Sequence, residues 1–504
     1  MKNVRTFIPI LLLFVSMTAH AAEHTGTLEG TIAGRDIATN HLTVAHGEVK
    51  GLMGAMTMSY EVRGQKVASL PKNGAHITAT LHESDGTYWL TEVGEKHTMA
   101  GHDMAGMSMP APSPAPSQPA NMSSDPTADL LMRQASGSSM NPAAAPMHMS
   151  MAQYGDWMLM LHGQAFISQV VESGPRGDDK LFSTNWIMGM ASRPLGGGQL
   201  MLRSMLSLEP LTVGKKYPEL FQTGETIHGR PIVDGQHPHD FVMELAAEYA
   251  HPLTSGTIGY IYAAPFGDPA LGPVAYPHRA SAAEIPQAPL GHHVQDSTHI
   301  AGSVLTIGAQ SGAFGYAFSG FHGREPDENR WDIDTGKLDS WSARMTFDPS
   351  PNWTAQLSTG HLHHPEAAEP ANVQRTTASV AYSDSRLDTS LIFGHNQKSA
   401  GHDTTSFLGE AVLHVGGVHY VTGRGEIVDK DELLANGSYR IKALTAGYSR
   451  DLPNRGRIAG AVGANVTVYS VPPAIRSYYG SNPRAFYIFL RLRGHDQSMQ
   501  HMHM

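Results

Sequence analysis

The 504-residue sequence contains no cysteine. This absence excludes disulfides, iron–sulfur clusters, thiolate zinc sites and cysteine nucleophiles. It also excludes a multicopper oxidase, because the electron-transfer copper of those enzymes needs a cysteine ligand. The only soft sulfur ligand left is the thioether of the 26 methionines, which binds Cu(I) or Ag(I) well and hard cations poorly.

An excess of positive charge and long apolar runs are also missing. The formal net charge is -10 at pH 7, and a phosphate backbone is bound by a basic face, so we expect no nucleic-acid partner. After residue 22 no run reaches the roughly 18 apolar residues of a transmembrane helix. The mature chain is therefore either soluble outside the cytoplasm or inserted in a membrane as a barrel.

Residues 1–22 have the pattern of a secretory signal peptide. Lys2 and Arg5 precede an apolar run from Phe7 to Met17, and Ala19-His20-Ala21 is a small-x-small cleavage site. The apolar run is too short to anchor the chain across a bilayer. The sequence therefore predicts export from the cytoplasm.

Three regions follow the signal peptide. Residues 23–96 contain short alternating runs between glycine-containing turns, which predict a small closed β-barrel. Residues 97–153 are rich in proline, alanine, serine, methionine and histidine without periodicity, which predicts a flexible, disordered linker. Residues 154–494 form a long series of alternating segments, and residues 495–504 are a tail rich in methionine and histidine.

The alternating segments of residues 154–494 predict strands. They number sixteen, and their connections alternate between short and long, which is typical of an antiparallel outer-membrane β-barrel. They start near residues 157, 181, 198, 239, 256, 301, 313, 339, 352, 373, 386, 405, 418, 439, 456 and 484. A soluble β-sandwich, or a pair of them, is the alternative, and an amphipathic helix is a local alternative for residues 239–251.

The two faces of these segments predict what the barrel encloses. Mixed charges are tolerated in a lumen and costly in lipid, so the lumen should hold Arg203, Asp240, Glu244, Glu248, Arg344, Arg375, Glu410, Arg424, Glu426, Arg440 and Lys442. Aromatic residues that would suit the lipid interfaces are Trp157, Trp186, Trp341, Trp353, Tyr420 and Tyr487. With an even strand number, the N-terminal region and the C-terminal tail should both lie in the periplasm, with outer-membrane lipid around the barrel.

The sequence around Met56-Thr57-Met58 predicts a soft metal site. The two methionines are two residues apart, so on a strand they point to one face, where a neighbouring strand can supply His46. Two thioethers and an imidazole suit Cu(I) or Ag(I). Packing of a small core is the alternative role for the same residues.

This segment resembles the metal loop of CusF-type periplasmic copper and silver binding domains. The resemblance covers residues 25–96 and implies a five-stranded OB-like barrel with His46, Met56 and Met58 as ligands. At the position of the family's tryptophan, which packs over the ion, this chain has Met53. Met53 is therefore either a third thioether ligand or a space-filler that leaves the ion more exchangeable.

The linker and the tail carry further soft ligands. In the linker these are His97, Met99, His102, Met104, Met107 and Met109, followed by Met147, His148, Met149 and Met151, and the tail holds Met499, His501, Met502, His503 and Met504. Such strings resemble the metal-binding segments of outer-membrane copper-resistance proteins of the CopB and PcoB type. They predict weak, rapidly exchanging capture of soft ions, and a plain spacer is the alternative.

Histidine and carboxylate also gather in two predicted long loops. The residues are His237, His239, Asp240, His292, His293, Asp296 and His299. Together they could hold Cu(II) or Zn(II). The alternative is loop architecture, in which these side chains cap turns and pair with Arg279, Arg324 and Arg330.

Two classes of function compete at this point. The first is copper or silver handling at the outer membrane, for resistance by sequestration or export, with periplasmic efflux or chaperone components as potential partners. The second is a barrel channel or enzyme with an accessory metal-binding domain, for which Asp296, Ser297 and His299 would be a hydrolase constellation. No nucleophile-elbow motif accompanies that trio, so we expect no enzymatic activity.

Overall fold

The computed structural model describes residues 24–37, 39–47, 49, 52–53, 56–84, 87–95, 125–368, 371–434, 437–453 and 457–494. The signal peptide, linker residues 97–124 with their methionines and histidines, and the tail lie outside this part of the chain. The chain divides into two compact units, residues 1–113 and 114–504. No helix among the described residues is long and apolar enough to cross a bilayer.

The first unit is a closed five-stranded barrel, as expected. Its strands are β1 (His24–Asp36), β2 (His41–His46), β3 (Met56–Val62), β4 (His76–Ser84) and β5 (Thr87–Glu95), with a 3-10 turn η1 (Val67–Ser69) after β3. The order around the barrel is β1-β2-β3-β5-β4. β1 is long enough to pair with β2 along one half and with β4 along the other, which closes the barrel around a core that includes Leu28, Leu42 and Leu81.

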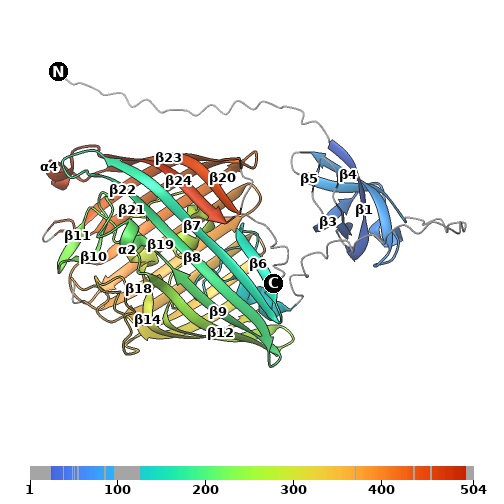
Figure 1. Cartoon of the computed structure of the whole chain (residues 1–504), viewed down its shortest axis with the longest axis horizontal. Coiled ribbons are helices and arrows are strands. Elements are labelled where there is room, and N and C mark those ends of the chain that lie inside the picture. Colours follow the sequence, from blue (N-terminus) through green and yellow to red (C-terminus); the bar gives the residue numbers. More distant parts are fainter. Residues whose placement is uncertain are drawn as a thin grey trace, which may run out of the picture. The chain divides into compact units, whose positions relative to one another are not determined.

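The second unit is a closed antiparallel barrel of sixteen strands, which confirms the predicted class and count (Figure 1). Its strands are β7 (Trp157–Glu172), β8 (Asp179–Leu195), β9 (Gly198–Leu206), β12 (Val242–Thr254), β13 (Thr257–Gly267), β14 (Ala301–Ser311), β15 (Phe314–His322), β16 (Ser340–Ser350), β17 (Trp353–Leu362), β18 (Val373–Ser383), β19 (Leu387–Lys398), β20 (Thr404–Val415), β21 (His419–Lys430), β22 (Tyr439–Asp451), β23 (Ile458–Ser470) and β24 (Arg484–Gly494). β24 pairs with β7 and closes the ring. Residues 242–254 form the strand β12, so the helical alternative for this segment is wrong.

Side chains alternate between an apolar outer face and a polar lumen. On β23, Ile458, Val462 and Val466 are exposed outward, whereas Ala461 and Asn465 are buried inside. Leucines on the outer face are exposed as well, and the side chain of Leu391 on β19 is 67% exposed. An apolar exterior around a charged interior is what a lipid-spanning barrel requires and what a water-soluble sandwich avoids.

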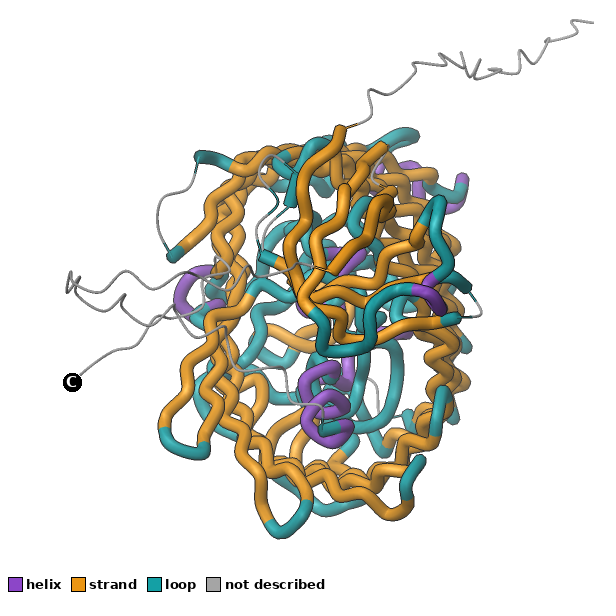
Figure 2. Tube along the Cα trace, turned by 90° about the vertical axis from the view of Figure 1, so that its right-hand side faces the viewer, coloured by secondary structure: helices purple, strands orange, loops and turns teal. Residues whose placement is uncertain are grey.

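Two long loops fold into the ring of strands and fill it (Figure 2). Between β9 and β12 lie α2 (Glu209–Thr212) and the hairpin β10 (Thr223–Ile227) and β11 (Arg230–Val233). Between β13 and β14 lie η2 (Tyr276–His278), η3 (Ala280–Ala282), α3 (His292–Gln295) and η4 (Ser297–His299). A third connection, from β23 to β24, holds η5 (Pro473–Ile475) and α4 (Arg476–Tyr479).

The linker ends earlier than the composition predicted. From Asp125 onward the chain is folded: α1 (Pro126–Arg133) packs against β9 and β12, and β6 (Met149–Tyr154) pairs with β7. Asp125 caps α1 by accepting from the Thr127 amide. Low-complexity composition did not reveal this segment, because the contacts of α1 with β9 and β12 join residues distant in sequence.

Some predicted orientations were wrong. Arg440 and Lys442 face outward near the long-loop end of β22, and Arg440 pairs with Asp429 instead of entering the lumen. Trp186, Tyr420 and Tyr487 point inward, because they lie on the same face of their strands as the buried lumen residues. The other predicted lumen charges are buried, as expected: Arg203, Asp240, Glu244, Glu248, Arg344, Arg375, Glu410, Arg424 and Glu426.

Candidate metal centres

The predicted soft ligands of the small barrel lie on one ladder. His46, the last residue of β2, is directly opposite Met56 on β3, and Val44 is opposite Met58. Residues opposed across a ladder share a face, as do residues two apart on one strand, so the register puts the positions of His46, Met56 and Met58 on one face of the β2–β3 pair. Met58 packs against the hydrophobic core and His46 is buried.

A tyrosine, which the sequence did not indicate, completes this site. The Tyr60 hydroxyl lies 2.5 Å from His46 Nε2 and 3.2 Å from Met53 Sδ. On the other side of the ring, His46 Nδ1 lies 2.7 Å from the Gly47 carbonyl oxygen, so Nδ1 carries the proton and Nε2 offers its lone pair. Burial, with a smaller effect of Tyr88, raises the pKa of Tyr60 to about 12, so the phenol stays neutral at pH 7.

The loop histidines, far apart in sequence, converge in the lumen of the large barrel. His237 and His239 precede β12, His292 and His293 lie in α3, and His299 ends η4. Neighbouring ring centroids are 5.2 to 5.4 Å apart along the series His237, His293, His292, His299, His239. We call these five residues the imidazole cage.

The cage has the hydrogen-bond pattern of metal-binding histidines. Nδ1 of His292 bonds the Asp296 carboxylate at 2.7 Å, Nδ1 of His239 bonds Glu209 at 3.0 Å, and Nδ1 of His299 bonds the Asp296 carbonyl oxygen at 2.8 Å. Meanwhile Nε2 of His239 and His299 is buried without a hydrogen bond, and Nε2 of His237 lies 3.3 Å from Glu225 Oε1. A ligating imidazole typically donates from one nitrogen to an acceptor and leaves the other for the ion.

The cage also encloses a space. A cavity of about 10 Å³ is lined by all five cage histidines, which is close to the minimum that holds one water molecule or ion. Potential ligand atoms of His237, His292 and His293 lie within 4.8 Å of one another, and so do those of His293, Glu325 and Glu366. Glu325 and Glu366 come from two further loops, and no spacing in the sequence pointed to them.

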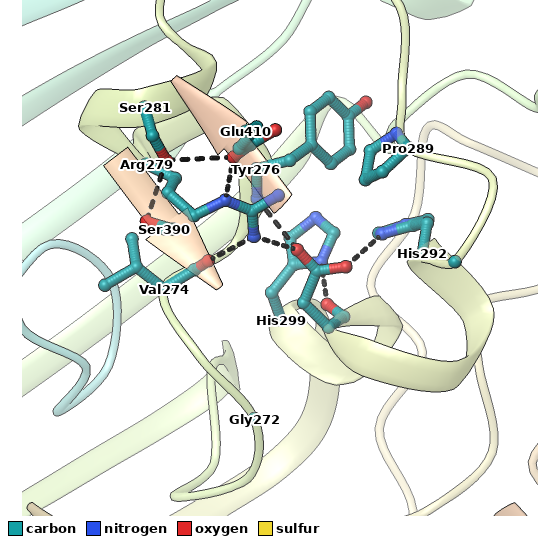
Figure 3. A network of polar contacts seen from close by, with 12 residues as sticks. Gly272, Val274, Tyr276, Arg279, Ser281, Pro289, His292, His299, Ser390 and Glu410 are labelled. Carbon is teal, nitrogen blue, oxygen red and sulfur yellow. Dashed lines mark hydrogen bonds and ion pairs between the residues drawn. The ribbon is translucent and has the colours of Figure 1, made fainter. Parts of the chain in front are cut away.

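Asp296 and Asp240, which were predicted as metal ligands, pair with arginine side chains. Asp296 accepts from Arg279 at 3.0 Å while it orients His292, and Arg279 in turn bonds Glu410 on β20 (Figure 3). Asp240 lies 3.4 Å from Arg330. Both aspartates therefore position the loops, as the architectural alternative held, while the histidines around them remain available.

The hydrolase constellation is not assembled. His299 Nδ1 contacts the main-chain oxygen of Asp296 and not its carboxylate. The Ser297 hydroxyl accepts from Arg375 at 3.0 Å. Neighbours in sequence thus point to different partners, which is why adjacency is weak evidence for a catalytic triad.

One family of known proteins matches the sequence of the small barrel. Residues 25–95 match the family described as "Copper binding periplasmic protein CusF". The N-terminal domain is CusF-like. A solved structure of apo-CusF residues 6–88 from Escherichia coli is similar at 17% identity, over 16% of this chain and 100% of that chain, with a TM-score of 0.15.

Other solved structures are similar over the large barrel. An anion-selective porin from Comamonas acidovorans is 15% identical, over 67% of this chain and 99% of that chain, with a TM-score of 0.45. Salmonella typhi OmpF in complex with daunomycin is 11% identical, over 68% of this chain and 99% of that chain, with a TM-score of 0.43. No curated protein matches the chain.

Proposed function

We propose that this protein binds Cu(I) or Ag(I) through its CusF-like domain and serves metal resistance at the outer membrane by sequestration. The observation that carries the proposal is the register that sets His46 opposite Met56, with Met58 two residues on, in a segment that matches a copper-binding family. Met53, held against the Tyr60 hydroxyl, is positioned to act as a third thioether. The matched family is described as a copper-binding periplasmic protein, which fits metal binding as the role of this domain.

The barrel and the predicted signal peptide support the proposed location. A closed sixteen-stranded barrel with an apolar exterior suits the outer membrane, and short turns face the periplasm in such proteins. The segment that precedes β6 lies beside the short turn between β16 and β17, because the Ala144 amide donates to the Pro351 carbonyl oxygen in that turn. The CusF-like domain and the tail would then be periplasmic, where exchangeable linker ligands could deliver ions or meet efflux components.

The imidazole cage is a second, harder site in this proposal. Three or more imidazoles with Glu325 and Glu366 nearby suit Cu(II) or Zn(II) better than Cu(I). The in-folded loops and buried charges around the cage favour holding an ion over free passage, so sequestration is favoured over an open channel.

The test is a pair of conservative substitutions in the full chain. Met56→Leu with Met58→Leu removes both sulfurs and keeps the apolar volume that packs the core. We expect the affinity of the N-terminal site for Cu(I), measured by competition with a chromophoric chelator, to fall at least about a hundredfold, and copper tolerance of cells to fall with it.

The matched control is Met345→Leu, a methionine on the outer face of the large barrel. It should leave both affinity and tolerance unchanged. Unaltered Cu(I) affinity in the Met56→Leu, Met58→Leu variant would refute the assignment of the site.

A further inference from the structure

Four side chains form a row across the inner wall of the large barrel. Met149 on β6 is directly opposite His162 on β7, His162 is opposite Met188 on β8, and Met188 is opposite Met205 on β9. Opposed residues share a face, with Cβ atoms about 4.5–5.5 Å apart. Met149, Met188 and Met205 are each at most 9% exposed. We call these four residues the thioether row.

A histidine from the in-folded loop caps this row. His278, at the end of η2, places Nε2 3.1 Å from Met205 Sδ. Its ring centroid lies 5.9 Å from that of His162 and 4.2 Å from that of Trp186. Two imidazoles and at least two thioethers therefore converge from the wall and from the loop.

The site also has an unused donor and an approach. His162 Nε2 is buried without a hydrogen-bond partner. A cavity of about 130 Å³ is lined by His162 of the row, by His278, Met190 and Trp186, and by residues 141–143 and 145–148 near the short-turn end of the barrel. A buried polar nitrogen that faces a cavity without a partner costs stability unless a ligand satisfies it.

The nearest charged groups on this wall are paired with one another. Arg203, the preceding lumen-facing residue on β9, lies 2.6 Å from Glu248 and 3.8 Å from Glu244. The thioethers and imidazoles of the row are therefore the groups left to contact an ion.

We propose that the thioether row and His278 form a second soft-metal site, for Cu(I) or Ag(I), inside the barrel. The proposal deepens the proposed function, since it makes the barrel a metal-holding part and not only an anchor. It is distinct from the imidazole cage in ligand type: sulfur and imidazole here, imidazole and carboxylate there. The same loop carries His278 to this site and His292, His293 and His299 to the cage.

The test uses the full chain with Met56→Leu and Met58→Leu, which removes the N-terminal site from the measurement. Silver nitrate is titrated into the detergent-solubilised protein in chloride-free buffer, and tryptophan fluorescence is followed. Trp186 adjoins His278, so saturable quenching is expected and should disappear with Trp186→Phe. Adding Met188→Leu and Met205→Leu should weaken the Ag(I) affinity at least tenfold.

The matched control is Met201→Leu with Met243→Leu, two buried methionines on the same wall but outside the row. This control should retain the quenching and the affinity. Heat-dependent mobility in detergent gels checks that every variant is folded. Absence of Trp186 quenching in the parent, or equal affinity in the row variant and the control, would overturn the proposal.

The two proposals can fail separately. If the Met56→Leu, Met58→Leu chain loses Cu(I) affinity and shows no quenching by Ag(I), the assignment of the CusF-like site stands and the barrel site is refuted. Quenching that persists while those substitutions leave N-terminal Cu(I) affinity unchanged supports the barrel site and removes the N-terminal assignment.

Discussion

His46 shows how a single residue can be held ready for an ion. Its Nδ1 bonds the Gly47 carbonyl and its Nε2 bonds the Tyr60 hydroxyl, so the lone pair that would reach a metal is occupied by a weak partner. An ion must displace that hydroxyl, which can then turn to Met53 Sδ at 3.2 Å. Tyr60 thus sets the cost of loading the site.

Tyr60→Phe should therefore tighten metal binding. It removes the competing hydrogen bond, worth about 0.5–1.5 kcal/mol, and should raise the affinity for Cu(I) or Ag(I) about two- to tenfold. Competition titration of the full chain measures the change. Tyr88→Phe, on β5 of the same barrel, is the control. Weaker binding in Tyr60→Phe would mean that the hydroxyl positions His46 and does not compete with the ion.

At the scale of elements, the in-folded loops are fastened by buried ion pairs. Arg279 joins Asp296 within its own loop to Glu410 on the wall, and Arg424 bonds the other oxygen of Glu410 at 2.8 Å. Asp296 at the same time orients His292. The short helix α3 is too short to hold its histidines by itself, so these pairs fix the cage.

Asp296→Asn should weaken the cage for Zn(II). The substitution keeps the shape of the side chain but loses the charge that orients the His292 imidazole, and loss of such a partner typically costs 10–100-fold in affinity. Zn(II) suits this test because thioether sites bind it poorly. Equilibrium dialysis of the full chain measures the retained zinc.

Asp156→Asn, at an exposed acid in the turn between β6 and β7, is the control for the charge change. Equal zinc retention in the two variants would show that Asp296 serves only the loop. A change of heat-dependent gel mobility in Asp296→Asn alone would show the expected loss of loop fastening.

At the scale of the molecule, the large barrel is wide but filled. Sixteen strands can enclose an aqueous channel, yet loops from four connections and pairs such as Arg203–Glu248 occupy this lumen. A filled lumen conducts ions poorly and gives buried ligands a protected environment.

The intact chain should show little conductance in planar lipid bilayers. Replacing residues 276–299 by a short glycine-serine link removes the in-folded part of one of these loops and should produce resolvable open-channel steps. Large steady conductance of the intact chain would favour the channel alternative. Replacing residues 416–418, the short turn between β20 and β21, by glycine and serine is the control and should not open it.

The sequence alone determined the class of each barrel. Period-two alternation depends only on neighbouring residues, so sixteen strand starts were predicted to within about three residues, and Met56-Thr57-Met58 with His46 marked the proposed soft site through local spacing. Even so, alternation could not tell where a strand leaves the lipid, so the outward-facing Arg440 was wrongly assigned to the lumen.

Only the tertiary structure decided which distant residues meet. The cage joins histidines from two loops to Glu325 and Glu366 from two others, and the thioether row depends on the register of four strands. Register and loop in-folding are set by closure of the barrel and by buried charge pairs, which act between residues far apart in the chain. For that reason Met149 lay in a predicted linker, yet the structure places it in the wall.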